Sequence, residues 1–363
     1  MAKTKQARFS VRIVKREPLP WYSRVGIRAL AILAALVVTG VVITLLTDAN
    51  PIEVYVSMFK GSFGTPLRVW SLLQGIAILL CISLAVTPAF KMRFWNCGAE
   101  GQALVGGLAS AAIMMFCGNS VPYPILLVLM VLAAMLCGII WALLPAVSKA
   151  LWNTNETLFT LMMNYVAIQL VAFFLKAFVK NGSGVLTPMP EYGLPKLFGQ
   201  DYLLNIVIVT VLTVLVYIYL KHTKHGYEVA VVGESENTAR YIGISVKKVV
   251  IRTLVVSGAL CGIAGLLLVG GTNHTISTTT VGGQGFTAIM VSWLAKFNPL
   301  FMVLTTFLII FLDKGTKQVA EDFRMPNALS SIVTGIILFF IIGCEFFLQY
   351  RITITKNEKE DAK

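Results

Sequence analysis

Long apolar runs recur along this chain, and they limit its fold more than any other feature. A helix needs about 20 apolar residues to cross the roughly 30 Å hydrocarbon core of a bilayer. Lipid offers no hydrogen-bond partner to an open strand edge, so such runs fold as helices. The runs lie at about residues 27–47, 69–90, 99–117, 124–145, 157–178, 203–220, 250–270, 285–296, 299–313 and 326–348.

The run at 285–296 is too short to cross a bilayer upright, which predicts a re-entrant or broken helix there. Composition supports a membrane location for the rest, because only 13% of the 363 residues are charged, whereas soluble chains carry about 25%. A chain this poor in charge cannot cover itself with a surface compatible with water. The sequence therefore predicts an all-α, polytopic membrane protein with about eight to ten transmembrane helices.

The net charge of +13 is concentrated in the N-terminal segment and in a few connections between runs. The basic residues before the first run and at its start are Lys3, Lys5, Arg8, Arg12, Lys15, Arg16, Arg24 and Arg28. Under the positive-inside rule they predict a cytoplasmic N-terminus, and the connections holding Lys91, Lys149 and 221–252 then also lie inside. Segment 314–325 departs from this pattern. We expect both termini to be cytoplasmic, and the basic charge to set topology without binding nucleic acid.

These features divide the chain into three parts. A basic cytoplasmic tail is expected at 1–26, a transmembrane domain at 27–348 and a second cytoplasmic tail at 349–363. The first apolar run exceeds the usual core of a cleavable signal peptide, so it is interpreted as the first span.

The inner loop at about 221–249 is the most structured polar segment of the domain. Ser235 is placed to cap a short helix, with Glu236 in the first turn. Gly243 is placed to end that helix. A short cytoplasmic helix flanked by basic residues predicts a protein partner, and a simple connector is the alternative.

No motif for catalysis or metal binding is present in the sequence. It contains no GxxxxGK[ST], HExxH or GxSxG. His222 and His225 lie three residues apart without a carboxylate cluster, so no metal site is expected. The six cysteines have no CxxC spacing and are expected to be reduced thiols. We predict no catalytic residue and no cofactor bound by this chain.

Polar residues inside the apolar runs are the remaining candidates for function. Ionisable and polar groups at membrane depth usually face a path or a partner, although an interfacial or helix-pairing role is an alternative for each. Two runs open alike, with "GAEGQALVGG" and "VGGQGFTAI", which hints at an internal repeat with a site between its halves. The residues expected along a substrate path are Glu100, Gln102, Asn164, Gln284, Thr287 and Ser292.

Four segments, in order, resemble bacterial ABC-importer permeases for nucleosides and simple sugars. "FWNCGAEGQALVGG" is similar to that family's F-N-I-G-x-E-G-Q signature, and "NETLFTLMMNYVA" to its N-E-x-x-x-T-L-M-x-N-Y-I segment. "GESENTARYIGISVKK" resembles the inner-loop G-x-N-x-x-A-A-x-Y-x-G-I stretch, and "GGQGFTAIMVSWLAKFNPL" a later segment that ends in proline. The final "PNALSSIVTGIILFF" is similar to the family's last span.

The resemblance implies a permease subunit of the bacterial cytoplasmic membrane that conducts a solute without its own ATPase. It implies a second permease subunit, identical or paralogous, a cytoplasmic ABC ATPase that binds ATP and Mg²⁺, and an extracellular solute-binding lipoprotein. The inner loop would then couple to the ATPase. The residues this implies for coupling are Glu234, Ser235, Asn237, Ala239, Tyr241 and Gly243.

Within this family the sequence favours a nucleoside as the solute. A sugar of the ribose or galactose type is the first alternative, and a branched-chain amino-acid permease is a more distant relative. Cys97, Ser292, Trp293 and Lys296 depart from the family pattern, and the last three lie near the expected path. A stand-alone secondary transporter is the alternative from another class, but the ionisable residues lie at span ends. Glu100 is expected to cap its own helix, which begins near residue 99, and to support the broken segment beside the path.

Overall fold

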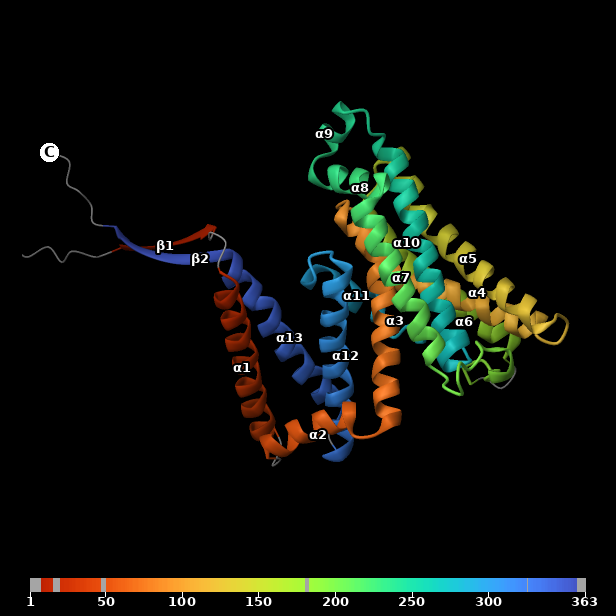
Figure 1. Ribbon diagram of the computed structural model, residues 1–363, viewed down its shortest axis with the longest axis horizontal. Helices are drawn as coiled ribbons and strands as arrows, with labels where there is room; N and C mark the ends of the chain where they lie inside the picture. Colours follow the sequence, from red (N-terminus) through yellow and green to blue (C-terminus); the bar gives the residue numbers. More distant parts are fainter. Residues whose placement is uncertain (1–7, 16–19, 47–49, 180–182, 325, 358–363) are drawn as a thin grey trace, which may run out of the picture. The chain divides into compact units, whose positions relative to one another are not determined.

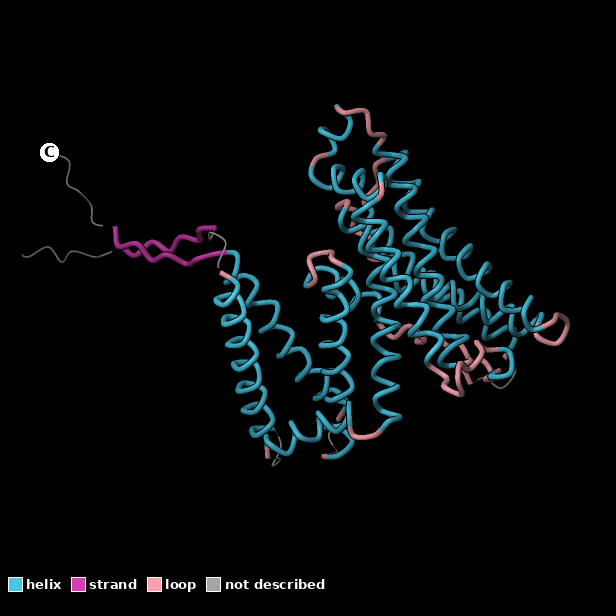
Figure 2. Tube along the Cα trace, in the orientation of Figure 1, coloured by secondary structure: helices cyan, strands magenta, loops and turns pink. Residues whose placement is uncertain are grey.

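The computed structural model describes residues 8–15, 20–46, 50–179, 183–324 and 326–357. The chain forms two compact units, one made of Pro66–Phe311 and the other of Met1–Thr65 with Leu312–Lys363. Helices make up most of both units, as the tube in Figure 2 shows. The all-α prediction is therefore confirmed.

The unit Pro66–Phe311 holds most of the helices. They are α3 (Pro66–Lys91), α4 (Ala99–Cys117), α5 (Tyr123–Trp152), α6 (Glu156–Phe178), α7 (Leu203–His222), α8 (Lys224–Glu234), α9 (Glu236–Tyr241), α10 (Val246–Leu268), α11 (Gln284–Leu294) and the start of α12 (Pro299–Asp322). A 3₁₀ turn, η1, spans Pro190–Tyr192, and a π-helical turn, η2 (Val269–Asn273), extends α10.

Seven of the described helices are long and apolar enough to cross a membrane. These are α3, α4, α5, α6, α7, α10 with η2, and α12. Helices α1 (Trp21–Leu46) and α13 (Asn327–Gln349) contain shorter apolar stretches, at Ala29–Leu45 and Ile332–Leu348. The short run predicted to be a broken helix forms α11, which has only 11 residues. The chain is thus a multi-pass membrane protein.

Helix α10 lies at the centre of its unit, packed against α3, α4 and α5. Of its apolar window 78% is buried, compared with 28% for α5, α6 and α7. Small residues permit the close approach: a Cβ on Gly262 would collide with the backbone of Ala134 in α5, and a Cβ on Gly106 of α4 would collide with Gly262. Lipid-embedded helices pack through such small residues because van der Waals contact replaces the hydrophobic driving force.

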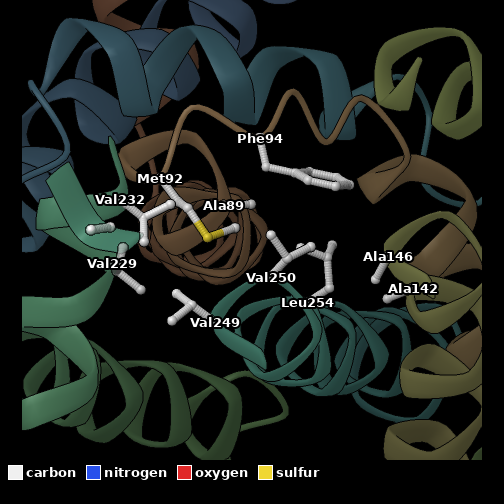
Figure 3. Packing of buried hydrophobic residues seen from close by; sticks show 11 residues of the cluster. Ala89, Met92, Phe94, Ala142, Ala146, Val229, Val232, Val249, Val250 and Leu254 are labelled. Atoms are coloured by element: carbon white, nitrogen blue, oxygen red, sulfur yellow. The ribbon is translucent and has the colours of Figure 1, made fainter. Parts of the chain in front are cut away.

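Helices α8 and α9 lie at one end of this unit, and segment 183–202 lies at the other (Figure 1). A cluster of buried apolar residues joins α8 and α9 to the ends of α3, α5 and α10 (Figure 3). Its members are Ala89, Met92, Phe94, Ala142, Ala146, Val229, Val232, Ala239, Val249, Val250 and Leu254. This packing fixes the two short helices to three spans.

The second unit contains β1 (Arg8–Lys15), α1, α2 (Pro51–Phe63), the end of α12, α13 and β2 (Tyr350–Asn357). Helix α2 packs on α12, where Cβ atoms on Gly61 and Gly315 would collide with Gln318 and Met58. The strands β1 and β2 pair antiparallel, with Arg8 opposite Asn357. Neither α2 nor this strand pair was predicted from the sequence.

The predicted runs otherwise correspond to helices. The run at 99–117 is α4 with the same bounds, whereas the run at 299–313 continues as α12 to Asp322. The single helix expected in the inner loop is preceded by a second one, α8, so the loop holds two helices. The division into tails and domain, and the side of the membrane on which each end lies, remain predictions.

Candidate functional site

The side chain of Glu100, near the start of α4, binds the start of α11. The backbone N–H of Gly283 donates to its Oε1 at 2.7 Å, and the N–H of Gly285 donates to its Oε2 at 2.7 Å. These are among the N–H groups at a helix start that have no partner within their own helix. A carboxylate placed there also complements the positive end of the helix dipole. Glu100 therefore caps α11 across 183 residues of sequence.

This arrangement corrects the expectation that Glu100 caps its own helix. Helix α4 follows Gly98, a glycine that has no side chain to cap it, and Glu100 makes its two hydrogen bonds to the start of α11. Gly283 precedes α11 with φ +80°, a conformation that suits glycine, and it too supplies no side chain. The missing cap of α11 comes from α4, so one carboxylate links two helix starts.

Gly285 allows the two helix starts to approach. A Cβ on Gly285 would lie 2.5 Å from the backbone nitrogen of Glu100 and 2.8 Å from its Cα. No side chain fits in that space without moving one helix. The glycine after Gln284 in "GGQGF" is thus required by contact with "GAEGQ", and the two similar openings meet directly.

Helix α6 holds the loop before α4 through two polar side chains. The N–H of Cys97 donates to Thr160 Oγ1 at 3.1 Å, and the N–H of Gly101 donates to Asn164 Oδ1 at 2.9 Å. Asn164 Nδ2 in turn donates to the carbonyl of Cys97 at 2.9 Å. Asn164 thus fixes the backbone on both sides of Glu100. We call Cys97, Glu100, Thr160, Asn164, Gly283 and Gly285 the junction.

A buried amide network lies beneath the junction. Asn96 Oδ1 accepts from the N–H of Gly98 at 3.1 Å and from Gln102 Nε2 at 3.2 Å. Asn96 Nδ2 donates to Ser257 Oγ of α10 at 3.2 Å. Both amides are buried, and Gln102 is 1% exposed. The predicted path residue Gln102 therefore bonds to protein groups within the bundle.

The other predicted path residues occupy different settings. Ser292 is fully buried and donates toward the carbonyls of Ser83 and Ala288. Thr287 donates to the carbonyl of Gly283 at 3.3 Å. Gln284 has a buried Oε1 with no hydrogen-bond partner among the described residues. The structure therefore brings Glu100, Asn164 and the start of α11 together, while Gln102 and Ser292 face other helices.

Aromatic rings near the junction were not predicted as a group. Trp95 stacks on Trp293 of α11, with ring centroids 5.6 Å apart and planes at 26°. Phe90 meets both rings edge-on, at 5.7 and 6.4 Å. The departure of Trp293 from the family pattern was the available signal, but nothing in the sequence paired it with Trp95.

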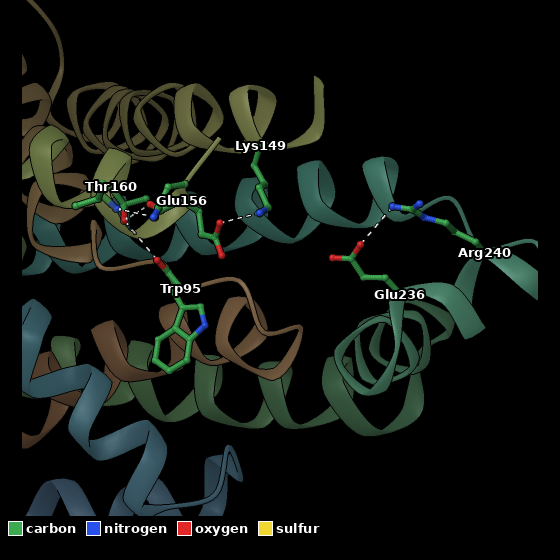
Figure 4. Close-up of polar contacts among 8 residues, drawn as sticks. Trp95, Lys149, Glu156, Thr160, Glu236 and Arg240 are labelled. Atoms are coloured by element: carbon green, nitrogen blue, oxygen red, sulfur yellow. Dashed lines mark hydrogen bonds and ion pairs between the residues drawn. The ribbon is translucent and has the colours of Figure 1, made fainter. Parts of the chain in front are cut away.

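Beside the junction, the turn between α5 and α6 is held by an ion pair. Lys149 Nζ lies 2.9 Å from Glu156 Oε2 (Figure 4). Asn153 takes a left-handed conformation, φ 50°, at the end of α5. The predicted polar residue Glu156 thus stabilises a turn.

In the loop between α3 and α4, burial raises the pKa of the Cys97 thiol, so this cysteine stays protonated and unreactive near neutral pH.

The short helix α9 matches its prediction closely. Ser235 Oγ accepts from the N–H of Thr238 at 3.2 Å, and Gly243 after the helix has φ +82°. Ala239 is fully buried in the apolar cluster, whereas Tyr241 is 92% exposed. Glu234 and Asn237 are also exposed. One face of α9 therefore packs on the apolar cluster, and the other face is exposed.

Comparison with known proteins gives a consistent set of relatives. A family model for the permease component of the branched-chain amino acid transport system matches residues 69–342. The glucose ABC transporter permease TsgB13 of Haloferax volcanii is 29% identical over 359 residues, covering 95% of this chain and 94% of that protein. The guanosine ABC transporter permease NupP of Bacillus subtilis is 27% identical over 310 residues, covering 83% and 88%. The nucleoside ABC transporter permease NupB of Lactococcus lactis is 26% identical over 334 residues, covering 88% and 91%.

Proposed function

Because this chain belongs to the ABC-transporter permease family described as the branched-chain amino acid transport system permease component, we propose that it forms the path for nucleosides through the cell membrane. As the membrane subunit, a permease of this family works with an ATPase and a substrate-binding protein. We further propose that ATP and Mg²⁺ are held by a separate cytoplasmic ATPase, and that the solute arrives from an extracellular binding lipoprotein. The second permease subunit is identical or paralogous.

The observation that carries this proposal is the convergence of three motif segments at the junction. Glu100, Asn164 and Gly285 come from three segments that resemble permeases for nucleosides and simple sugars, and they meet at the starts of α4 and α11. Broken helices whose ends lie within a bundle are typical of transporter substrate sites. The guanosine and nucleoside permeases among the relatives support a nucleoside as the solute.

In this proposal Glu100 is a positioning residue. Its two hydrogen bonds make the start of α11 move together with the start of α4. Asn164 ties the same loop to α6. Movement of one helix is thereby transmitted to the other two, which alternating access to a path between subunits requires.

Coupling to the ATPase is assigned to α8 and α9. The exposed face of α9 includes Tyr241, at 92% exposure, and Glu236 pairs with Arg240 at 3.3 Å (Figure 4). The buried face, through Ala239, contacts the cluster that holds the ends of α3, α5 and α10. A push on α9 from a docked partner would reach those spans through packed side chains.

A simple sugar is the second candidate solute, favoured by the glucose permease of Haloferax volcanii, which aligns with 95% of this chain. Measurements of uptake distinguish a nucleoside from a simple sugar as the solute. Cells lacking the chain, with and without its gene restored, are given labelled guanosine in the presence of unlabelled nucleosides, ribose or galactose, with ATP depletion as the control. We expect restored, ATP-dependent uptake that only nucleosides compete. Uptake of a labelled sugar without guanosine uptake would replace the nucleoside proposal with the sugar one.

A further inference from the structure

The two stacked indoles described above remain largely open to their surroundings. Trp95 is 45% exposed and Trp293 is 48% exposed, although each covers one face of the other. Most exposed apolar side chains of a membrane protein face lipid, so exposure alone does not distinguish these two. These two are distinguished by their place beside the junction and by the aromatic rings that pack against them.

Two phenylalanine rings and one hydrogen bond hold the tryptophan pair in place. Phe90 packs edge-on against both indoles, and Phe297 packs edge-on against Trp293 with centroids 5.2 Å apart. The carbonyl of Trp95 accepts from Thr160 Oγ1 at 3.4 Å, and Figure 4 shows the Trp95 ring pointing away from that contact. The backbone of Trp95 and the rings of both tryptophans are therefore held by other protein groups, while 45% of Trp95 and 48% of Trp293 stay exposed.

The pair also lies beside the junction, because the carbonyl of Trp95 accepts from the junction residue Thr160 and Trp293 lies in α11. Asn96, next to Trp95, bonds Ser257, which is eleven residues after Val246 at the start of α10. Ser292, next to Trp293, bonds the carbonyl of Ser83 inside α3. These bonds place the pair on segments that α3, α6 and α10 hold in place.

Apart from Gln284, whose Oε1 has no hydrogen-bond partner among the described residues, the polar side chains of the predicted path near the pair are already engaged. Gln102, Asn164 and Ser292 are buried and hydrogen-bonded to other protein groups. Glu100 is occupied by two backbone N–H groups. A solute that passes this part of the molecule therefore meets aromatic faces more readily than free donors and acceptors.

We propose that the exposed parts of the Trp95 and Trp293 rings bind the planar base of a nucleoside by stacking during its passage. This inference rests on the proposed function and assigns the part of the solute that is recognised. Stacking on an aromatic ring tolerates every base, because each has a π-face. It also lacks the directional hydrogen bonds that would hold a solute tightly, which suits a site that must release it. A free sugar has no such planar face.

Substitution of the two rings tests the proposal in the intact transporter. The variants Trp95→Leu and Trp293→Leu remove the π-face, Trp293→Phe keeps one, and Phe173→Leu replaces a 71% exposed ring on α6 as the matched control. Uptake of labelled guanosine is measured over a range of concentrations at equal membrane abundance. We expect each Leu variant to lose about tenfold in uptake at low concentration. Trp293→Phe should stay within about threefold of the original chain, and Phe173→Leu should equal it.

Two results would overturn the proposal. One is unchanged guanosine uptake by both Leu variants. The other is a loss of the partner permease subunit when the tagged Leu variants are purified with their complex, because the rings would then be contacts between subunits. If the proposed function itself is wrong, the unaltered chain will restore no guanosine uptake, and this is seen before any variant is tested.

Discussion

Helices α11 and α9 are both short and both begin with a side-chain cap, yet the two caps come from different distances. Ser235 caps α9 from the adjacent position, through Thr238 three residues on. Glu100 caps α11 from a segment 183 residues away. The first cap can stabilise only its own helix. The second cap also holds two elements together, so its loss should affect the assembly around it. A local cap stabilises only the helix that follows it, whereas a distant cap also couples two helices to each other.

The largest effect is expected from Glu100→Ala. It leaves the N–H groups of Gly283 and Gly285 without their charged acceptor, a loss of about 2–4 kcal/mol for two such bonds at a half-buried site. Guanosine uptake should fall by at least about tenfold, with lower thermal stability of the purified complex. Glu100→Gln is the matched control: its single amide oxygen can satisfy one N–H, so its loss should be smaller. Equal uptake by Glu100→Ala and the original chain would show that the distant cap is not a link.

Asn164→Ala should have the next largest effect. It removes the acceptor for the N–H of Gly101 and the donor to the carbonyl of Cys97, both in a buried setting. The expected cost is about 2–3 kcal/mol, measured as a lower unfolding temperature. Asn164→Asp keeps the acceptor but not the donor and should be intermediate. Identical unfolding of all three chains would mean that α6 does not hold the loop.

Gly285→Ala tests the close approach of the two helix starts. The added Cβ would lie 2.5 Å from the nitrogen of Glu100, and such overpacking costs about 1–3 kcal/mol. Gly335→Ala in α13 is the control, because a Cβ there meets nothing within 4 Å. Lower stability and uptake are expected for the first variant only. If the two variants behave alike, the openings are not in tight contact.

The smallest effect is expected from Ser235→Ala. Loss of a local N-cap costs about 1 kcal/mol, and it should be confined to α9, whose far face is anchored by Ala239. Limited proteolysis of the inner loop should become faster while the unfolding temperature of the whole complex changes little. Ser235→Asp retains a capping oxygen and should resist proteolysis like the original chain. A global loss of stability would contradict the distinction between the two caps.

The same distinction explains how much could be predicted from the sequence. The apolar runs predicted α4 with its observed bounds, and the Ser235 and Gly243 signals predicted α9, because these features are local. Glu100 was singled out from the sequence, but its partner helix was not, since hydrogen bonds across 183 residues leave no local pattern. Stacking of Trp95 on Trp293 depends on the same tertiary approach. The pairing of β1 with β2 joins the two ends of the chain and was missed for the same reason.

Hydrogen exchange of the intact complex in lipid nanodiscs tests the central claim most directly. Backbone amides of 283–287 and of 236–243 are followed in the original chain, in Glu100→Ala and in Ser235→Ala. The account predicts that Glu100→Ala speeds exchange at 283–287 by about tenfold or more and leaves 236–243 unchanged, with the reverse for Ser235→Ala. Unchanged exchange at 283–287 in Glu100→Ala would contradict the claim that α4 caps α11.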